Sequence, residues 1–343
     1  MQTVKYYLKR YFIDAMGAMA LGLFASLLIG TIFKTLGEYT SVSAFVEIET
    51  YASAASGMAI GVAVAYSLKA DPLVIFSCAA AGSMGYSFGT EIAAEAGTIA
   101  YTAGPAGAFA SAVFASELGM CVSKKTKIDI LVTPVVTLLT GYAIAWAVSP
   151  GIAYVMYYLG DFVNTATAFQ PVLMGIVVSA VVGVILTLPI SSAAICAMIG
   201  ISGVAGGAAA VGCCCQMVGF AVISFRENKW SGVVAQGLGT SMLQMGNICK
   251  KPQIWIAPTL ASAVCGPLAA AVFRLECTGV SAGMGTCGLV GPIGIIAATP
   301  HTPLMWSGLI LLCFVLPALL SFLFNEVLRR IGWVKTGDMK LDL

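Results

Sequence analysis

Amide side chains inside apolar sequence are the residues whose chemistry is most informative in this chain. The stretch SMLQMGN, from Ser241 to Asn247, places Gln244 and Asn247 three positions apart, on one face of a helix. An amide both donates and accepts hydrogen bonds, so this pair suits a small neutral polyol as ligand. The alternative is that both amides hydrogen-bond a neighbouring helix. A further amide, Gln216, lies in the stretch VGCCCQMVGF and is predicted to reach the same cavity as Gln244.

A glycine-rich run, FRLECTGVSAGMGTCGLVGPIG (residues 273–294), carries a carboxylate at its edge. Its six glycines leave backbone amide and carbonyl groups open to approach. Glu276 is suited to accept hydrogen bonds from substrate hydroxyls, and Ser281 and Thr286 add hydroxyls of their own. The alternative is that Glu276 forms an ion pair with Arg274. The run lacks the lysine of a phosphate-binding loop, which excludes nucleotide binding.

Two serines follow a proline in a third stretch, TLPISSAAI (residues 187–195). Pro189 interrupts a long apolar segment, as expected for a broken helix that lines a cavity, although serines also hydrogen-bond their own helix. The full predicted substrate-binding set is Gln244, Asn247, Glu276, Thr286, Ser281, Gln216, Ser191 and Ser192. The sequence offers no catalytic residue.

Three consecutive cysteines, Cys213 to Cys215, precede Gln216. Successive helical residues point about 100° apart, so the three thiols face three directions and cannot hold one ion together. The 11 cysteines of the chain form no C-x-x-C motif and no Cys/His cluster. We therefore predict that these cysteines serve close helix packing, with no metal and no cofactor.

Composition defines the medium in which these side chains lie. The chain has 343 residues, of which 59% are hydrophobic and 9% charged, and its mean hydropathy is +0.95. A soluble domain carries about 25% charged residues. The fold class is therefore an all-α polytopic membrane protein. A net charge of +2 gives no indication of nucleic-acid binding.

Apolar runs of membrane-spanning length recur along the chain. We expect about ten transmembrane helices, together with re-entrant or broken hairpins, for which the short segment 211–225 and the glycine- and proline-rich segment 278–299 are candidates. The acidic residues Glu91 and Glu95 are predicted to lie in a loop. The apolar segments are 11–33, 51–68, 72–90, 104–122, 130–148, 170–188, 190–209, 211–225, 231–249, 253–273, 278–299 and 303–326.

Basic residues between the apolar segments predict orientation. By the positive-inside rule, the basic clusters place both termini in the cytoplasm. Lys250 and Lys251 then fall on the opposite side, against that rule. The cytoplasmic basic residues are Lys5, Lys9, Arg10, Lys124, Lys125, Lys127, Arg226, Lys229, Arg329, Arg330, Lys335 and Lys340.

Two similar stretches indicate an internal repeat. KKTKIDILVTPVVTLLTG begins at Lys124 and KKPQIWIAPTLASAVCG at Lys250, and both read as a lysine pair followed by an apolar helix with a proline. An odd number of apolar segments separates them, which predicts an inverted-topology repeat, a feature of secondary transporters. The repeats would cover about residues 51–150 and 190–300. The alternative is chance similarity between two apolar helices.

Four longer stretches carry a family resemblance that extends over about residues 10–330. They are DPLVIFS (71–77), GPAGAF to SKKTKIDILVTP (104–134), GTSMLQMGN (239–247) and SAGMGTCGLVGPIG (281–294). Together they resemble the EIIC-like membrane proteins of the phosphotransferase system, in the PfoR-like branch. The chain is interpreted as a single integral-membrane EIIC-like domain, residues 1–343, without a soluble EIIA or EIIB domain.

This resemblance implies a function and its partners. EIIC proteins are sugar permeases of the bacterial inner membrane, usually homodimeric, and an EIIB protein phosphorylates the arriving sugar. They generally bind sugar with a Glu on a hairpin and a nearby His. Glu276 is the counterpart of that Glu, whereas His301 lies between two prolines outside the predicted spans.

Three functions follow from the sequence. The first is an EIIC-type permease for a small polar solute, a sugar, with an EIIB-like protein acting in trans and membrane lipids around it. The second is a membrane sensor or regulator of the PfoR type, which binds a ligand without transport. The third, least favoured, is a transporter of a metal or sulfur compound.

Overall fold

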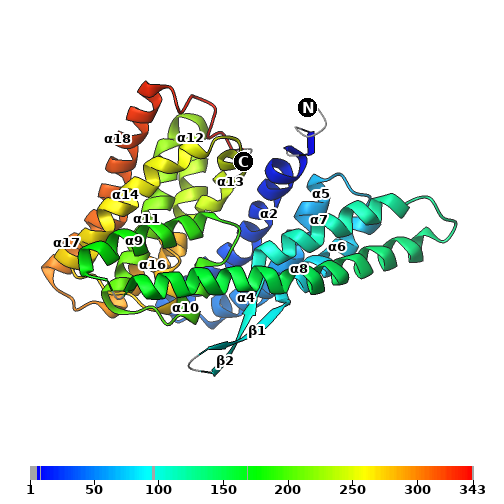
Figure 1. Cartoon of the computed structure of the whole chain (residues 1–343), viewed down its shortest axis with the longest axis horizontal. Helices are drawn as coiled ribbons and strands as arrows, with labels where there is room; N and C mark the ends of the chain where they lie inside the picture. Colours follow the sequence, from blue (N-terminus) through cyan, green and yellow to red (C-terminus); the bar gives the residue numbers. More distant parts are fainter. Residues whose placement is uncertain (1–5, 8, 95–96, 168, 342–343) are drawn as a thin grey trace. The chain divides into compact units, whose positions relative to one another are not determined.

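The computed structural model describes residues 6–7, 9–94, 97–167 and 169–341 and is helical over most of them (Figure 1). The chain divides into two compact units, Met1–Tyr157 and Tyr158–Leu343. The boundary falls inside the long helix α8 (Asp129–Thr167). Lys5, predicted to be cytoplasmic, and Glu95, predicted to lie in a loop, are outside the described residues.

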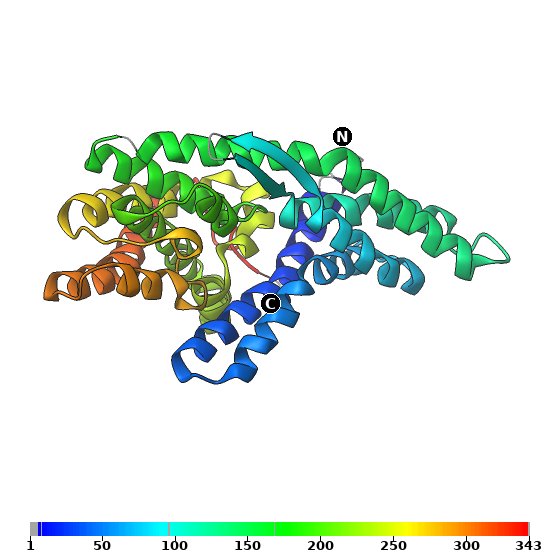
Figure 2. The same ribbon diagram turned by 90° about the horizontal axis from the view of Figure 1, so that it is seen from below.

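Unit 1 is built from closely packed helices. Helices α5, α6 and α7 pack against one another. Helices α3 and α4 lie side by side (Figure 2). Glycine permits the close approach, because a Cβ atom on Gly61 would lie 2.0 Å from the carbonyl oxygen of Cys78. The elements, with η denoting short π- or 3₁₀-helical segments, are η1 (Arg10–Ala15), α2 (Met16–Leu23), η2 (Phe24–Leu28), α3 (Ile29–Thr40), α4 (Ser43–Ala54), α5 (Ser56–Ser67), α6 (Pro72–Ser87), β1 (Gly89–Ala94), β2 (Gly97–Thr102) and α7 (Gly104–Val122).

An antiparallel hairpin, β1 and β2, occupies the region predicted to be a loop. Ile92 lies opposite Ile99, and Thr90 opposite Tyr101. Branched and aromatic residues such as these favour strands, but the segment is too short for its pattern to stand out beside long apolar helices. Glu91, predicted as a loop charge, is instead an exposed residue of β1.

Length and hydropathy identify the helices that can cross a membrane. Among the described residues, six helices are long and apolar enough, or seven if the bent pair Ser43–Ala54 and Ser56–Ser67 forms one span. The predicted all-α polytopic membrane protein is therefore confirmed. The count of about ten spans stays a prediction. The six helices are Met16–Lys34, Gly104–Val122, Asp129–Thr167, Gly203–Ile223, Pro252–Val272 and Pro303–Ile331.

Unit 2 surrounds one buried helix, α11, with α9, α14 and α18. Gly212 of α11 lies against the backbone of Ser179 in α9, and Ser179 donates a hydrogen bond to the carbonyl oxygen of Ser262 in α14 at 2.7 Å. The elements are α9 (Pro171–Thr187), α10 (Ser192–Met198), α11 (Gly203–Ile223), α12 (Phe225–Val234), η3 (Ala235–Gly239), η4 (Ser241–Gln244), α13 (Met245–Lys250), η5 (Pro252–Trp255), α14 (Ile256–Pro267), η6 (Leu268–Val272), α15 (Gly279–Ala282), η7 (Cys287–Leu289), α16 (Val290–Ala298), α17 (Pro303–Ile310), η8 (Leu311–Val315) and α18 (Leu316–Ile331).

The predicted division of this region into segments 190–209 and 211–225 is wrong. Helix α11 runs unbroken through Gly212, and the break lies earlier, at Gly200 and Gly203, whose φ angles are +62° and +60°. Glycine tolerates positive φ, so it ends α10 there. At position 212, glycine instead allows α9 to approach.

The segment from α12 to α13, predicted as a span over 231–249, turns back within unit 2. Asn228 near its start and Asn247 near its end both hydrogen-bond the segment that follows α18, at Met339 and Lys340. Lys250 therefore lies at the same end of unit 2 as Lys340, and their predicted placement on opposite sides is wrong. The inverted repeat, which was used to explain that placement, stays a prediction.

Candidate functional site

Interrupted segments of the chain meet beside the middle of α11. Cys213 is the central residue of this 21-residue helix. An added Cβ on Gly285, in the glycine-rich run, would lie 2.7 Å from the carbonyl carbon of Cys213. Segment η3 contacts η7 of the same run. Discontinuous helices that meet in this way form the binding sites of many transporters.

Gln216 of α11 belongs to a hydrogen-bond network that connects α11 with α9, η5 and α14. Its Oε1 accepts from Trp255 Nε1 at 3.1 Å, and its Nε2 donates to Thr259 Oγ1 at 3.1 Å. Thr187, at the end of α9, contacts Gln216 Oε1 weakly at 3.5 Å and shares a 2.8 Å hydrogen bond with Ser241. The amide therefore links α11 to η5 and α14 directly, and to α9 and the start of η4 through Thr187.

Ser191 and Ser192 have different partners. Ser191 caps α10, because its Oγ accepts a hydrogen bond from the backbone nitrogen of Ala194 at 3.2 Å. Ser192 is buried and donates to the carbonyl oxygen of Gly283 at 2.7 Å. One hydroxyl thus starts a short helix, and the other ties that helix to the glycine-rich run.

The glycine-rich run holds an unsatisfied hydroxyl. Thr286 is 1% exposed, and its Oγ1 has no hydrogen-bond partner among the described residues. Positive φ angles at Gly288 and Leu289, +52° and +61°, turn the chain directly after it. Ser281 is half-buried against Gly294. A buried hydroxyl without a partner is costly, so Thr286 is the strongest indication of a ligand in this region.

Glu276 lines a pocket of about 490 Å³ in unit 2 with Arg274 and Gln170. Thr299 fixes the backbone here, accepting from the Glu276 nitrogen at 2.8 Å and donating to its carbonyl oxygen at 3.1 Å. The predicted Arg274–Glu276 pair is not among the ion pairs of the described residues. The remaining lining residues are Pro171, Val172, Val204, Ala270 and Ala271.

Comparison with known protein families shows to which family the chain belongs. Residues 13–341 match the family Phosphotransferase system, EIIC (PTS_EIIC_2). The chain belongs to this EIIC family. It is therefore a membrane permease component of phosphotransferase-type transport, which works with other components of that system on a transported substrate. The chain has no significant match among curated proteins or solved structures.

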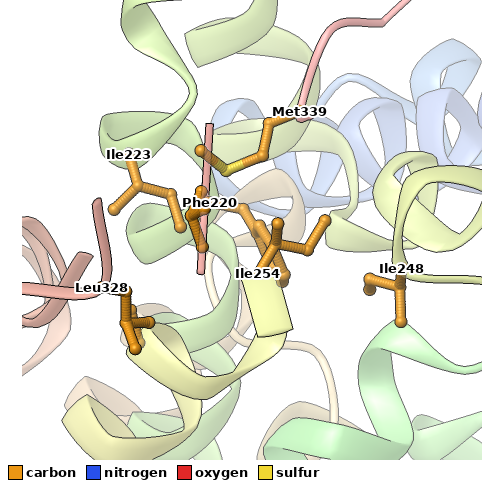
Figure 3. Packing of buried hydrophobic residues seen from close by; sticks show 8 residues of the cluster. Phe220, Ile223, Ile248, Ile254, Leu328 and Met339 are labelled. Atoms are coloured by element: carbon orange, nitrogen blue, oxygen red, sulfur yellow. The ribbon is translucent and has the colours of Figure 1, made fainter. Parts of the chain in front are cut away.

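In this EIIC chain, Gln244 and Asn247 bind backbone groups. Gln244 Nε2 donates to Gln236 Oε1 at 2.9 Å and to the carbonyl oxygen of Met339 at 3.0 Å. Asn247 Nδ2 donates to Gln244 Oε1 and to the carbonyl oxygen of Lys340, both at 2.9 Å. Met339, from the segment after α18, packs in a buried cluster with Phe220 near the end of α11, and its side chain lies above Phe220 in Figure 3. These two amides are thus engaged by the segment after α18 and do not share the Gln216 network.

The cysteines of the EIIC chain point to three different helices. Cys213 Sγ lies 3.8 Å from the carbonyl oxygen of Val182, Cys214 contacts Cys313, and Cys215 contacts Cys265. The predicted divergence of the three side chains is confirmed. Within the described part of the chain, no group of three or more His, Cys, Asp or Glu side chains is placed to hold a metal ion.

Sequence reasoning missed several polar residues around these features. Thr187 stands directly before the break in TLPISSAAI, and a threonine at the end of an apolar helix is the signal that could have identified it. Thr299 and Gln170 gave no such signal, because their roles depend on residues far away in sequence, Glu276 above all.

Proposed function

We propose that this EIIC protein is the permease for a small polar solute, a sugar. The observation that carries the proposal is the buried, unpartnered hydroxyl of Thr286, beside the place where interrupted segments meet the middle of α11. A sugar hydroxyl in that region would supply the missing partner. Ser281, half-buried in the same run, carries a hydroxyl of the type that recognises polyols. Ser192 supports this run from α10, because its hydroxyl donates to Gly283.

Glu276 is proposed as the acidic residue of the solute pathway. It lies beside Gly207, which is six positions before Cys213 on α11, a rise of about 9 Å along the helix. Its pocket offers a carboxylate, a guanidinium group and an amide, which together both donate and accept hydrogen bonds. A volume of about 490 Å³ is in the range of small-molecule sites.

Further features of the proposal come from the sequence and the family. We propose a bacterial inner membrane protein with cytoplasmic termini, a homodimer, and an EIIB-like protein that acts in trans. Gln216, Ser191, Gln244 and Asn247 are proposed to shape the site from a distance, because their polar groups already have partners within the chain.

The test is solute binding and counterflow with the purified full chain in proteoliposomes. We expect a member of a sugar and polyol panel to raise the thermal midpoint and to exchange across the membrane. Thr286→Val keeps the shape and removes the hydroxyl, so it should weaken solute binding about tenfold without loss of folding. Glu276→Gln should reduce flux, whereas Glu47→Gln, at an exposed position in unit 1, serves as the matched control.

Three results would count against parts of this proposal. If no sugar or polyol shifts the thermal midpoint, the sugar proposal is wrong. If a ligand binds but no counterflow follows, the PfoR-type sensor is favoured over transport. If Thr286→Val binds solute as tightly as the parent chain, Thr286 does not contact it.

A further inference from the structure

A second pocket, of about 360 Å³, lies between α12 and α18, at the end of unit 2 opposite to Glu276 along α11. Its walls combine apolar, aromatic and charged side chains. They are Val222, Ile223, Phe225, Arg226, Trp230, Val233, Phe322, Asn325, Glu326 and Arg329.

Two buried polar atoms of these lining residues have no partner among the described residues. They are the acceptor Asn325 Oδ1 and the donor Arg329 Nε. Asn325 is 3% exposed. The other nitrogens of the Arg329 guanidinium already bind Glu227 at 3.1 Å and Thr336 at 3.3 Å. An acceptor and a donor are thus both left open in one pocket, which indicates a ligand with complementary groups.

A partly exposed ion pair among the lining residues gives the pocket one positive and one negative charge. Arg226 and Glu326 approach to 3.5 Å, and their side chains are 57% and 32% exposed. This separation is too long for a strong hydrogen bond, so most donors of the guanidinium and most acceptor sites of the carboxylate remain available. The pocket therefore presents two donors for an anion, Arg226 and Arg329, and two acceptors for a cation, Asn325 and Glu326.

The aromatic and basic residues around the pocket are of the kinds that are typical of a membrane boundary. Phe225 and Trp230 pack edge to face with ring centroids 5.4 Å apart, and Trp230 is 73% exposed. Exposed tryptophan is typical of the headgroup level of membranes. Apolar residues begin α18, and charged ones end it. The basic residues gathered at this end are Arg226, Lys229, Lys250, Arg329, Arg330 and Lys340.

We propose that this pocket binds the headgroup of a zwitterionic phospholipid, phosphatidylethanolamine. Its phosphate would contact Arg226 and Arg329, and its ammonium group would donate to Asn325 and Glu326. The trimethylammonium of phosphatidylcholine has no N–H to donate, and phosphatidylglycerol has no cation. Phe322, 40% exposed on α18, is placed to contact an acyl chain.

The test is lipid binding by the purified full chain in detergent, using dioleoyl forms of phosphatidylethanolamine, phosphatidylcholine and phosphatidylglycerol. We expect phosphatidylethanolamine to bind about tenfold more tightly than either of the others, as measured by native mass spectrometry. Asn325→Leu should remove most of this preference, because Asn325 accepts from the ammonium group, whereas Arg226→Gln should weaken the binding of all three lipids, since each carries the phosphate. Asn164→Leu, at an exposed position on α8, should leave it unchanged.

Soluble phosphoethanolamine distinguishes a lipid from a free phosphomonoester. The proposal predicts that millimolar phosphoethanolamine competes only weakly, since it lacks the acyl chains. Tight binding of phosphoethanolamine without lipid preference would overturn the proposal, as would equal binding of the three lipids. A rise in thermal midpoint for Asn325→Leu with the lipid preference intact would show that Asn325 is only an unsatisfied core residue, and would also overturn it.

Discussion

The two units of this chain differ in how deeply they bury the polar side chains compared here. In unit 1, the ion pairs Arg10–Glu117 and Asp71–Lys124 lie near helix ends and are partly exposed. In unit 2, amides such as Gln216 and Gln244 are fully buried and hydrogen-bonded. A buried polar group is costly in apolar surroundings unless it has a hydrogen-bond partner. Among the described residues, unit 2 buries more polar side chains than unit 1 and must therefore provide more such partners. We infer that unit 2 carries the solute chemistry.

The largest expected difference between the units concerns their ion pairs. Glu227 in unit 2 pairs with Arg329 at 3.1 Å with side chains 3% and 9% exposed, and it also accepts from the Met339 nitrogen. Glu227→Gln should lower the free energy of unfolding by about 4 kcal/mol, because it leaves a buried guanidinium without its counter-charge. Glu117→Gln in unit 1, where the pair is 23% and 32% exposed, should cost about 1 kcal/mol. Similar losses in denaturation of the two variants would contradict the comparison.

A smaller loss of stability is expected from replacing Met339, which packs in the buried cluster with Phe220. Met339 is fully buried against Phe220 and Ile254. Met339→Ala should cost about 3 kcal/mol, since it leaves a cavity among these side chains. Met58→Ala, at a residue of α5 that is 41% exposed, should cost less than about 0.5 kcal/mol and is the control. The thermal midpoint in detergent measures both, and equal midpoints would mean that the segment after α18 contributes little to stability.

Buried polar groups with and without partners give the next contrast. Gln216→Leu removes the partners of Trp255 and Thr259, so we expect a loss of about 2 kcal/mol. Ser111 of α7 in unit 1 is equally buried, but its Oγ has no partner in the described part of the chain. Ser111→Ala should therefore leave stability unchanged or raise it slightly. Chemical denaturation of the two variants tests this, and a stable Gln216→Leu variant would remove the case for a structural network.

The smallest effect concerns the exposed contact between Asp71 and Lys124. The hydrogen bond from Lys124 lowers the pKa of Asp71. A carboxyl group whose pKa is lowered by folding stabilises the fold above its unfolded pKa, and this contribution is lost as pH falls through the folded value. Asp71→Asn should thus slightly lower the thermal midpoint near neutral pH, and its difference from the parent chain should shrink as the pH falls below about 4. A difference that grows on acidification would reverse this sign.

Local sequence predicted continuous helices well and interrupted ones poorly. The predicted segments 104–122 and 170–188 closely match α7 and α9. Both are uniform apolar helices, whose limits follow from composition and from the proline near each start. The segment 231–249 was predicted as a span because it is apolar enough. It turns back instead at Thr240, which adopts an extended conformation. Asn228 and Asn247 both hydrogen-bond the segment that follows α18.

The sequence by itself determined the medium, the family and the divergence of the three cysteines. These depend on composition, on long motifs and on the 100° helical step, which are local properties. Only the tertiary structure decided that Thr286 lacks a partner, that Glu276 faces a pocket, and that Gln244 binds a backbone 95 residues away. Hydrogen-bond satisfaction is a property of all neighbours in space, so no pattern along the chain can reveal which polar side chains remain open for a ligand.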